Sequence, residues 1–331
     1  MKLLESREAQ FAVEAVREAA LLVRRVQREM IGSGITKDDK SPVTVADFSA
    51  QAVVAKRLAD RFPDAALMGE ESAVALRTEQ GAETLAQITR FVQTVIPAAS
   101  PEQICDWIDR GVGERRATTW TLDPVDGTKG FLRRDQYAVA FALIVDGVVE
   151  FGVLGCPELE GAQRPVSGGA GSLLLAVRGQ GTWTQSLSDA KSPWTRLTVS
   201  GITDAAQARL LRSVEKGHTD TGGIGDLVRT LGVTADPVPM DSQAKYAVLA
   251  AGGGDVLLRL LSPSRPDYRE MVWDQAAGSI VVEEAGGRVS DLDGRPLDFS
   301  QGRTLAANRG VLATNGHLHD PVLAGLKAIS A

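Results

Sequence analysis

The segment 123–128, Asp-Pro-Val-Asp-Gly-Thr, constrains this chain more than any other, because it places two carboxylates directly after a short apolar strand. Pro124 fixes one φ angle and Gly127 permits a tight turn, so the side chains of Asp123 and Asp126 can face one point. Amides around such a turn are free to donate to a phosphate oxygen. The pattern indicates a site for a metal and a phosphate, although a plain loop with an Asx-turn would carry the same residues.

Three further acidic residues lie where predicted elements begin or end. Glu70 follows an apolar strand, and Asp47 and Asp274 lie at the starts of helices. The chain has 42 acidic residues, so most of its carboxylates must be solvated. Hard divalent cations need carboxylate oxygens that converge from separate parts of the backbone, and strand ends held by a sheet can supply them. We therefore predict a metal site from these residues, while Asp47 taken alone is better explained as a helix-start residue that supports the helix dipole.

Hydrophobic spacing divides the chain into two parts. Apolar residues at helical spacing predict helices over about 11–30 and 44–62, and a strand is expected over 65–68. Asp146-Gly147 between two apolar runs predicts a hairpin over 137–153. Beyond it we expect strands at 172–177, 209–214, 256–261 and 311–314, and helices at 220–231, 242–251 and 273–285. These patterns predict an α+β part over residues 1–165 and an α/β part over 166–331.

Composition excludes several classes of protein. The net charge of −6 argues against a nucleic-acid partner, which requires a broad excess of Lys and Arg. Two cysteines, Cys105 and Cys156, and three histidines are too few for a disulfide framework or a cysteine-built zinc site. No apolar run approaches membrane-spanning length, and the N-terminal residues lack the core of a signal peptide. We expect a cytoplasmic protein with structural thiols.

Residues 120–133, Trp-Thr-Leu-Asp-Pro-Val-Asp-Gly-Thr-Lys-Gly-Phe-Leu-Arg, resemble the central motif of the 3′(2′),5′-bisphosphate nucleotidases, a branch of the inositol monophosphatase superfamily. Segments 40–47, 69–72 and 273–278 are similar to its other metal motifs and follow in the same order. Segments 214–218 and 241–246 are similar to nucleotide-site segments of the branch. Arg134-Asp135 departs from the pattern, since relatives more often have smaller residues there.

The resemblance implies a layered α/β fold, the αβαβα sugar-phosphatase fold, with the active site between the two parts. It implies that two or three Mg²⁺ ions are held mostly by the first part, with the last ligand and the nucleotide site in the second. The implied metal ligands are Glu70, Asp123, Asp126, Asp274 and the Val125 carbonyl. Asp47 and Thr128 resemble the pair that activates the attacking water, and Glu71 is either an indirect contributor or a surface carboxylate. The implied substrate contacts are Gly127, Thr128, His218, Ser242, Lys245, Arg259 and Asp274.

Some of these assignments have plainer alternatives. A single lysine such as Lys245 is more often a solvated surface amine, and His218 could be a surface loop residue. Arg259 lies in the apolar run 256–261, where an unpaired charge is costly, so we predict a partner for it, at the nucleotide site if the resemblance holds.

The activity implied by the resemblance is hydrolysis of the 3′-phosphate of adenosine 3′,5′-bisphosphate to AMP and phosphate, with inhibition by lithium. The sulfated analogue and the 2′,5′ isomer are further expected substrates, and we expect a monomer. Two alternatives stay open. An inositol polyphosphate 1-phosphatase or broad sugar phosphatase would use the same metals without needing His218 and Arg259. A catalytically idle nucleotide sensor would not need the acidic residues and Thr128, which are all present.

Overall fold

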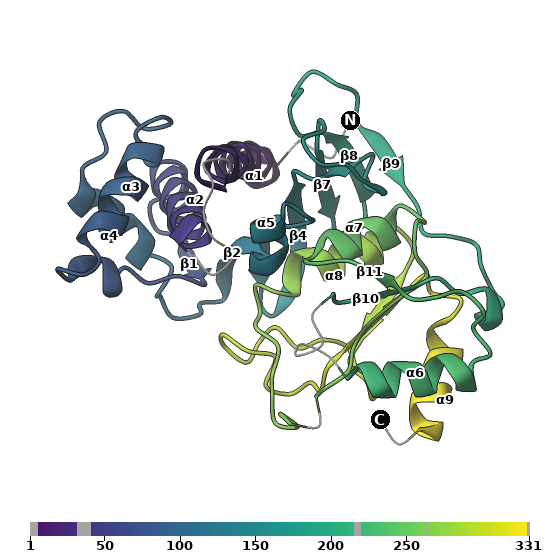
Figure 1. The fold of residues 1–331 in the computed structure, drawn as a ribbon. Coiled ribbons are helices and arrows are strands. Elements are labelled where there is room, and N and C mark those ends of the chain that lie inside the picture. Colours follow the sequence, from purple (N-terminus) through teal and green to yellow (C-terminus); the bar gives the residue numbers. More distant parts are fainter. Residues whose placement is uncertain (1–5, 32–40, 215–219, 263, 330–331) are drawn as a thin grey trace.

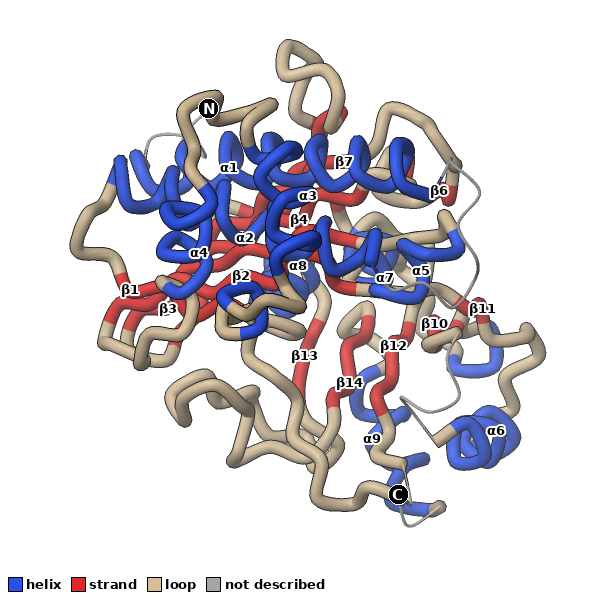
Figure 2. Tube along the Cα trace, turned by 60° about the vertical axis from the view of Figure 1, so that its left-hand side comes forward, coloured by secondary structure: helices blue, strands red, loops and turns tan. Residues whose placement is uncertain are grey.

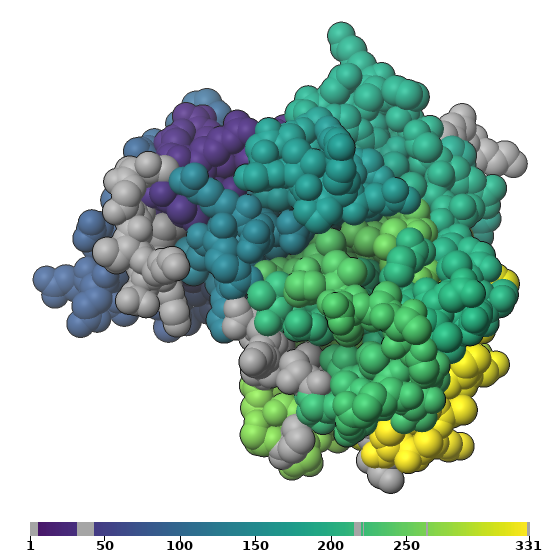
Figure 3. Space-filling model, turned by 45° about the vertical axis from the view of Figure 1, so that its right-hand side comes forward, coloured from purple at the N-terminus to yellow at the C-terminus, as the bar shows by residue number. Residues whose placement is uncertain are grey.

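The computed structural model of the chain describes residues 6–31, 41–214, 220–262 and 264–329. Within them, two sheets alternate with three layers of helices, which is the predicted αβαβα order (Figures 1 and 2). In the space-filling view, the teal segments of the first sheet lie directly against the green C-terminal half, and the yellow C-terminal segment is at the far end (Figure 3). No helix of the described ranges is both long and apolar enough to cross a membrane.

The outer helical layer is built from the N-terminal part of the chain. Its long helices are α1 (Arg7–Val26), which continues into the π-helical turn η2 (Gln27–Ile31), and α2 (Ser41–Arg61). The helices α3 (Ala82–Val92) and α4 (Pro101–Asp109) pack on α2, after the short turn η3 (Ala75–Arg77). Ser100 begins α4 with a capping box, in which its hydroxyl accepts from the Gln103 amide and the Gln103 side chain accepts from the Ser100 amide.

The first sheet has seven strands in the order β1-β2-β3-β4-β7-β8-β9. Their bounds are β1 Ala66–Gly69, β2 Thr118–Asp126, β3 Ala138–Val145, β4 Val148–Cys156, β7 Ser172–Val177, β8 Gly181–Ser186 and β9 Thr195–Leu197. A separate small ribbon pairs β5 (Leu159–Glu160) with β6 (Arg164–Pro165). The hairpin predicted at Asp146-Gly147 is confirmed, with both residues at positive φ. The sheet includes three strands from beyond residue 165, the position at which we expected the first part to end.

Alternation along β3 explains how this sheet is covered on both faces. Val139 and Phe141 belong to the core under α1 and α2, whereas Ala138 and Ala140 belong to the core under the next helical layer. The small side chains on the second face let a helix approach closely. A Cβ atom added to Gly152 on β4 would lie 2.8 Å from the backbone of Ala277, in the helix α8 (Ala276–Glu284).

The second helical layer lies between the sheets and contains α7 (Ala244–Ala250) and α8 (Ala276–Glu284). The second sheet has the order β11-β10-β12-β14-β13. Its strands are β10 Leu210–Arg212, β11 Val238–Pro239, β12 Val256–Arg259, β13 Arg288–Ser290 and β14 Val311–Thr314. The helices α6 (Thr221–Thr230) and α9 (His319–Ala328) lie on its far side and share a hydrophobic core with this sheet. The short turn η4 (Ala205–Gln207) precedes β10.

Several boundaries differ from those expected from the sequence. The strand β2 does not end at Asp123 but continues to Asp126, with a register shift against β3 between these residues. Asp47 lies inside α2, which begins at Ser41, so the alternative of a helix-start residue is wrong. Asp274 precedes α8 rather than beginning it. Cys105 and Cys156 are free and buried, as expected of structural thiols.

Candidate active site

The acidic residues predicted from strand ends converge because β1 and β2 are parallel neighbours. Gly69 pairs with Leu122 in the register of these strands, so Glu70 and Asp123 leave the same edge of the sheet side by side. Their carboxyl groups are close enough for each to shift the pKa of the other. Asp47 approaches the same point from α2, and carboxylate oxygens of Asp47, Glu70 and Glu71 all lie within 4.8 Å of one another.

The electrostatics of this cluster show an excess of negative charge. Burial, and then repulsion by Glu70 and its neighbours, raises the pKa of Asp47 and of Asp123 well above the ordinary range. Burial and repulsion by Asp126 also raise the pKa of Asp274 well above the ordinary range, although the positive charge of Arg259 opposes the shift. Burial of its carboxylate and repulsion by Glu71 and Asp126 raise the pKa of Glu70 to about 7, even though part of the side chain reaches solvent. Such a set of oxygens favours a bound cation.

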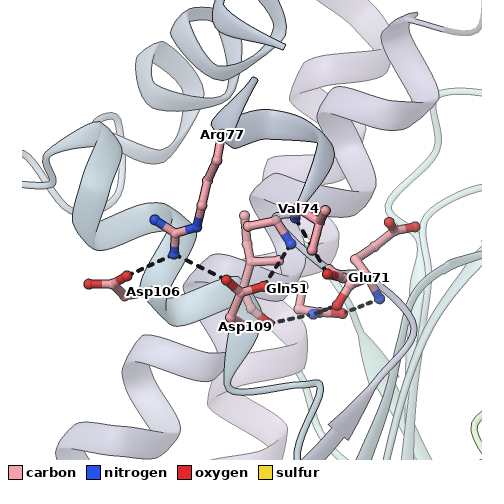
Figure 4. Close-up of polar contacts among 9 residues, drawn as sticks. Gln51, Glu71, Val74, Arg77, Asp106 and Asp109 are labelled. Atoms are coloured by element: carbon pink, nitrogen blue, oxygen red, sulfur yellow. Dashed lines mark hydrogen bonds and ion pairs between the residues drawn. The ribbon is translucent and has the colours of Figure 1, made fainter. Parts of the chain in front are cut away.

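A glutamine on α2 holds the Glu71 segment in place. Gln51 accepts a hydrogen bond from the Glu71 amide at 3.0 Å and donates to the Glu71 carbonyl at 2.7 Å (Figure 4). It also donates to the Ile108 carbonyl at 2.8 Å. Because Gln51 is one helical turn after Asp47, the helix that presents the Asp47 carboxylate also fixes the backbone of the neighbouring acidic pair.

Asp126 and Asp274 are linked through a second glutamine, Gln243. The Gln243 amide donates to the Asp126 carboxylate. Its side chain donates to the Trp273 carbonyl at 3.0 Å and accepts from the Gly278 amide at 2.9 Å. Gln243 is 2% exposed, so substitution by an apolar residue would leave the Trp273 carbonyl and the Gly278 amide buried without their hydrogen-bond partner. This residue fixes the end of β2 relative to the start of α8.

Lys245 is buried beside Asp126, so the alternative of a solvated surface amine is wrong. Its Nζ donates to the Ser242 carbonyl at 2.8 Å. Burial lowers the pKa of Lys245 to about 8, while the nearby carboxylate of Asp126 opposes the shift. Ser242 has a φ of 63°, a left-handed conformation, and its Cβ lies where a side chain on Gly127 would be, 2.8 Å away. Gly127, at φ 91°, is therefore required by both its conformation and its contact with Ser242.

The partner predicted for Arg259 is Glu270. The guanidinium lies 2.8 Å from the Glu270 carboxylate, which also accepts from the Gln275 side chain at 2.8 Å. The Tyr246 hydroxyl donates to Gln275, so the ion pair continues into a buried polar network. Burial opposes the charge of Arg259, but Glu270 and then Asp274 outweigh it and raise the pKa. Arg259 is on the same face of β12 as the core residue Leu257, which directs it toward the layer of α7 and α8.

The remaining predicted residues have different outcomes. Val125 lies where β2 shifts register, and its amide donates to Asp123 at 3.1 Å. Thr128 is exposed and is the first residue of α5 (Thr128–Arg133). His218 lies outside the described residues.

Sequence reasoning missed Gln51, Gln243 and Glu270. Their amides and carboxylate carry no metal-site pattern of their own, although Gln51 falls one turn after Asp47 and Gln243 follows Ser242 directly.

The residues present fit a hard divalent cation. Among the described residues, Asp47, Glu70 and Glu71 bring carboxylate oxygens close enough together to share one ion, and hard cations bind such oxygens in preference to nitrogen or sulfur. Burial is the main cause of the raised pKa values of Asp123 and Asp274, and repulsion between the neighbouring carboxylates adds to it.

Comparisons with known proteins agree with this geometry. The chain is 40% identical over 342 aligned residues to a Schizosaccharomyces pombe protein named 3′(2′),5′-bisphosphate nucleotidase, with 98% of this chain and 96% of that protein covered. Proteins with the same name in Emericella nidulans and Oryza sativa are 39% and 41% identical, covering 98% and 94% of this chain and 98% and 91% of their own lengths.

Solved structures share the fold. An IMPase of Thermotoga maritima matches with a TM-score of 0.63 and 18% identity, covering 98% of both chains. The SuhB protein of Mycobacterium tuberculosis matches with a TM-score of 0.62 and 21% identity, covering 97% of this chain and 95% of its own. The model of the inositol monophosphatase family matches residues 5–329, and with relatives near 40% identity over almost the whole length, this chain belongs to the inositol monophosphatase family, whose enzymes depend on metal ions.

Proposed function

We propose that this chain is a Mg²⁺-dependent phosphatase that removes the 3′-phosphate of adenosine 3′,5′-bisphosphate, giving AMP and phosphate. The observation that carries the proposal is the position of two cations, the buried Lys245 and the partly exposed Arg259, directly beside the acidic cluster. Both lower the pKa of Asp126 against the effect of burial, so both lie within reach of its charge. A substrate with two phosphates needs a metal site for one phosphate and a site of cationic side chains for the other. The names of the relatives at about 40% identity support the same choice.

In this proposal Glu70, Asp123, Asp126, Asp274 and the Val125 carbonyl hold two or three Mg²⁺ ions. When bound, these ions would neutralise the phosphate oxygens and lower the pKa of an attacking water. The chain's own contribution is the orientation of that water by Asp47 and Thr128. Asp47 is held rigidly on α2 and Thr128 follows the positive-φ turn at Gly127. The exposed position of Thr128 leaves its hydroxyl accessible to a substrate.

The nucleotide side of the site would be formed by Ser242, Lys245, Arg259 and, from the sequence alone, His218. Lys245 and Arg259 are attached to separate elements, α7 and β12, and are fixed by the Ser242 carbonyl and Glu270. Two preorganised cations suit the second phosphate of the substrate, which inositol 1-phosphate lacks. Accepting the sulfated analogue and the 2′,5′ isomer, inhibition by lithium, a monomeric state and a cytoplasmic location stay predictions.

A phosphate-release panel tests the proposal. The purified protein is assayed with Mg²⁺ on adenosine 3′,5′-bisphosphate, its 2′,5′ isomer, inositol 1-phosphate and inositol 1,4-bisphosphate. We expect the highest kcat/KM on the adenosine bisphosphates. A preference for either inositol phosphate would favour the sugar-phosphatase alternative, and no phosphate release from any substrate would favour the idle nucleotide sensor.

A further inference from the structure

Arg303 connects two acidic segments that are far apart in the chain. It is a half-buried residue between β13 and β14, and its Nη2 donates to the Gly69 carbonyl at 2.5 Å. Its Nη1 donates to the Gly111 carbonyl at 3.2 Å, and Gly111 in turn accepts from the Gly69 amide at 2.9 Å. Gly69 is the residue directly before Glu70. One guanidinium therefore fixes the backbone from which the Glu70 carboxylate projects.

The same guanidinium lies over the ring of Trp273, with its central carbon 4.6 Å from the ring centroid. Trp273 is 3% exposed and directly precedes Asp274. The backbone of this segment is also anchored there, since the Val272 amide donates to the Arg303 carbonyl at 3.0 Å and the Leu305 amide donates to the Glu270 carbonyl at 2.9 Å. Arg303 thus contacts the residue before Glu70 and the residue before Asp274.

We propose that Arg303 is a positioning residue that sets the separation of Glu70 and Asp274, and with it the affinity of the site for divalent cations. The inference rests on the proposed metal site. The planar fork of arginine can donate to two carbonyls while its face stacks on an indole, an arrangement that lysine cannot reproduce. The Arg303 charge attracts the Glu70 carboxylate but would repel a cation bound there, so a gain in cation affinity must come from the geometry that Arg303 imposes on the two carboxylates.

The test compares Arg303→Met with Arg303→Lys and with a control, Arg229→Met. Arg229 is an exposed arginine on α6 that pairs with Asp226, so its loss removes the same charge away from the site. For each full-length protein, thermal unfolding is measured across a Mg²⁺ titration, which gives the Mg²⁺ concentration for half of the maximal stabilisation. We expect this concentration to rise about tenfold or more in Arg303→Met, the usual effect of losing a residue that orients metal ligands. It should stay within about twofold of the wild type in Arg229→Met.

Arg303→Lys keeps the positive charge and one donor nitrogen in place of the two that bind the carbonyls, and it should fold even if Arg303→Met does not. We expect it to need several times more Mg²⁺ than the wild type. A lower unfolding temperature without Mg²⁺, combined with an unchanged half-saturating concentration in both variants, would overturn the proposal, because Arg303 would then only stabilise the fold. A wild-type protein without any response to Mg²⁺ would overturn it too. Phosphate release from the nucleotide is not part of the readout, so a wrong substrate assignment would leave the result unaffected.

Discussion

The guanidinium of Arg259 and the carboxylate of Glu270 form an ion pair at 2.8 Å, and the Glu270 side chain is only 4% exposed. Removing one partner of a buried pair leaves the other charge uncompensated, which commonly costs about 3 kcal/mol or more. We therefore expect Glu270→Gln to lower the free energy of unfolding by about 3 kcal/mol, measured by urea denaturation without Mg²⁺. Asp293→Asn, which breaks the exposed pair with Arg309, is the matched control and should change it by less than about 1 kcal/mol. If both variants lost the same small amount of unfolding free energy, Glu270 would not be needed to hold Arg259.

Asp126→Asn tests the metal assignment with little change of shape. The substitution removes a charged oxygen at the end of β2, while the neutral side chain still accepts from the Gln243 amide. We expect kcat to fall by on the order of a hundredfold or more, as for the loss of one preorganised charge at a reacting phosphate. Circular dichroism and the unfolding temperature should show an intact fold. Near-normal turnover in saturating Mg²⁺ would contradict the assignment.

Lys245→Met tests whether the buried amine reads the second phosphate. Methionine keeps most of the apolar stem and removes the charge, so we expect KM for adenosine 3′,5′-bisphosphate to rise by the equivalent of about 1.5–3 kcal/mol. Activity on inositol 1-phosphate should change little. Some loss of kcat on the nucleotide is also expected, because binding at a remote phosphate helps to orient the reacting one. Equal losses on both substrates would instead assign Lys245 to the support of Ser242 or Asp126.

The pKa of Glu70, near 7, predicts how pH acts on the protein without metal. The unfolded chain releases this proton near pH 4.5, whereas the folded protein keeps it to about pH 7. The folded state therefore binds more protons within this window, and the contribution of Glu70 to stability falls as the pH rises from about 4.5 to 7. Divalent cations need the ionised carboxylate, so the stabilisation by Mg²⁺ should be larger at pH 8 than at pH 6.

The check for this prediction is the Mg²⁺-induced shift of the unfolding temperature at both pH values. Glu70→Gln should reduce both the shift and its dependence on pH, because the titrating group is removed. A shift that is the same at pH 6 and pH 8 in the wild type would show that no carboxyl group with a raised pKa takes part in binding the cation.

Much of the fold and most of the acidic site could be predicted from local sequence signals. The apolar runs on either side of the Asp146-Gly147 turn and those before Glu70 and Asp123 are properties of short segments, and each one formed the expected element. The end of β2 was misplaced at Asp123, because Pro124 reads as a strand terminator, whereas the strand accommodates it by a register shift against β3.

What only the tertiary structure decided is which distant groups meet and how far they are buried. The sequence required a partner for Arg259 but gave no reason to choose Glu270, and it left Lys245 open as a surface amine. Arg303 reaches the Gly69 carbonyl across 234 residues, and Gln243 joins Asp126 to the segment before Asp274. The spacing of residues along a strand or helix is set by local backbone geometry and can be read from the chain. Hydrogen bonds between separate elements and the desolvation that moves a pKa arise only when the layers pack together.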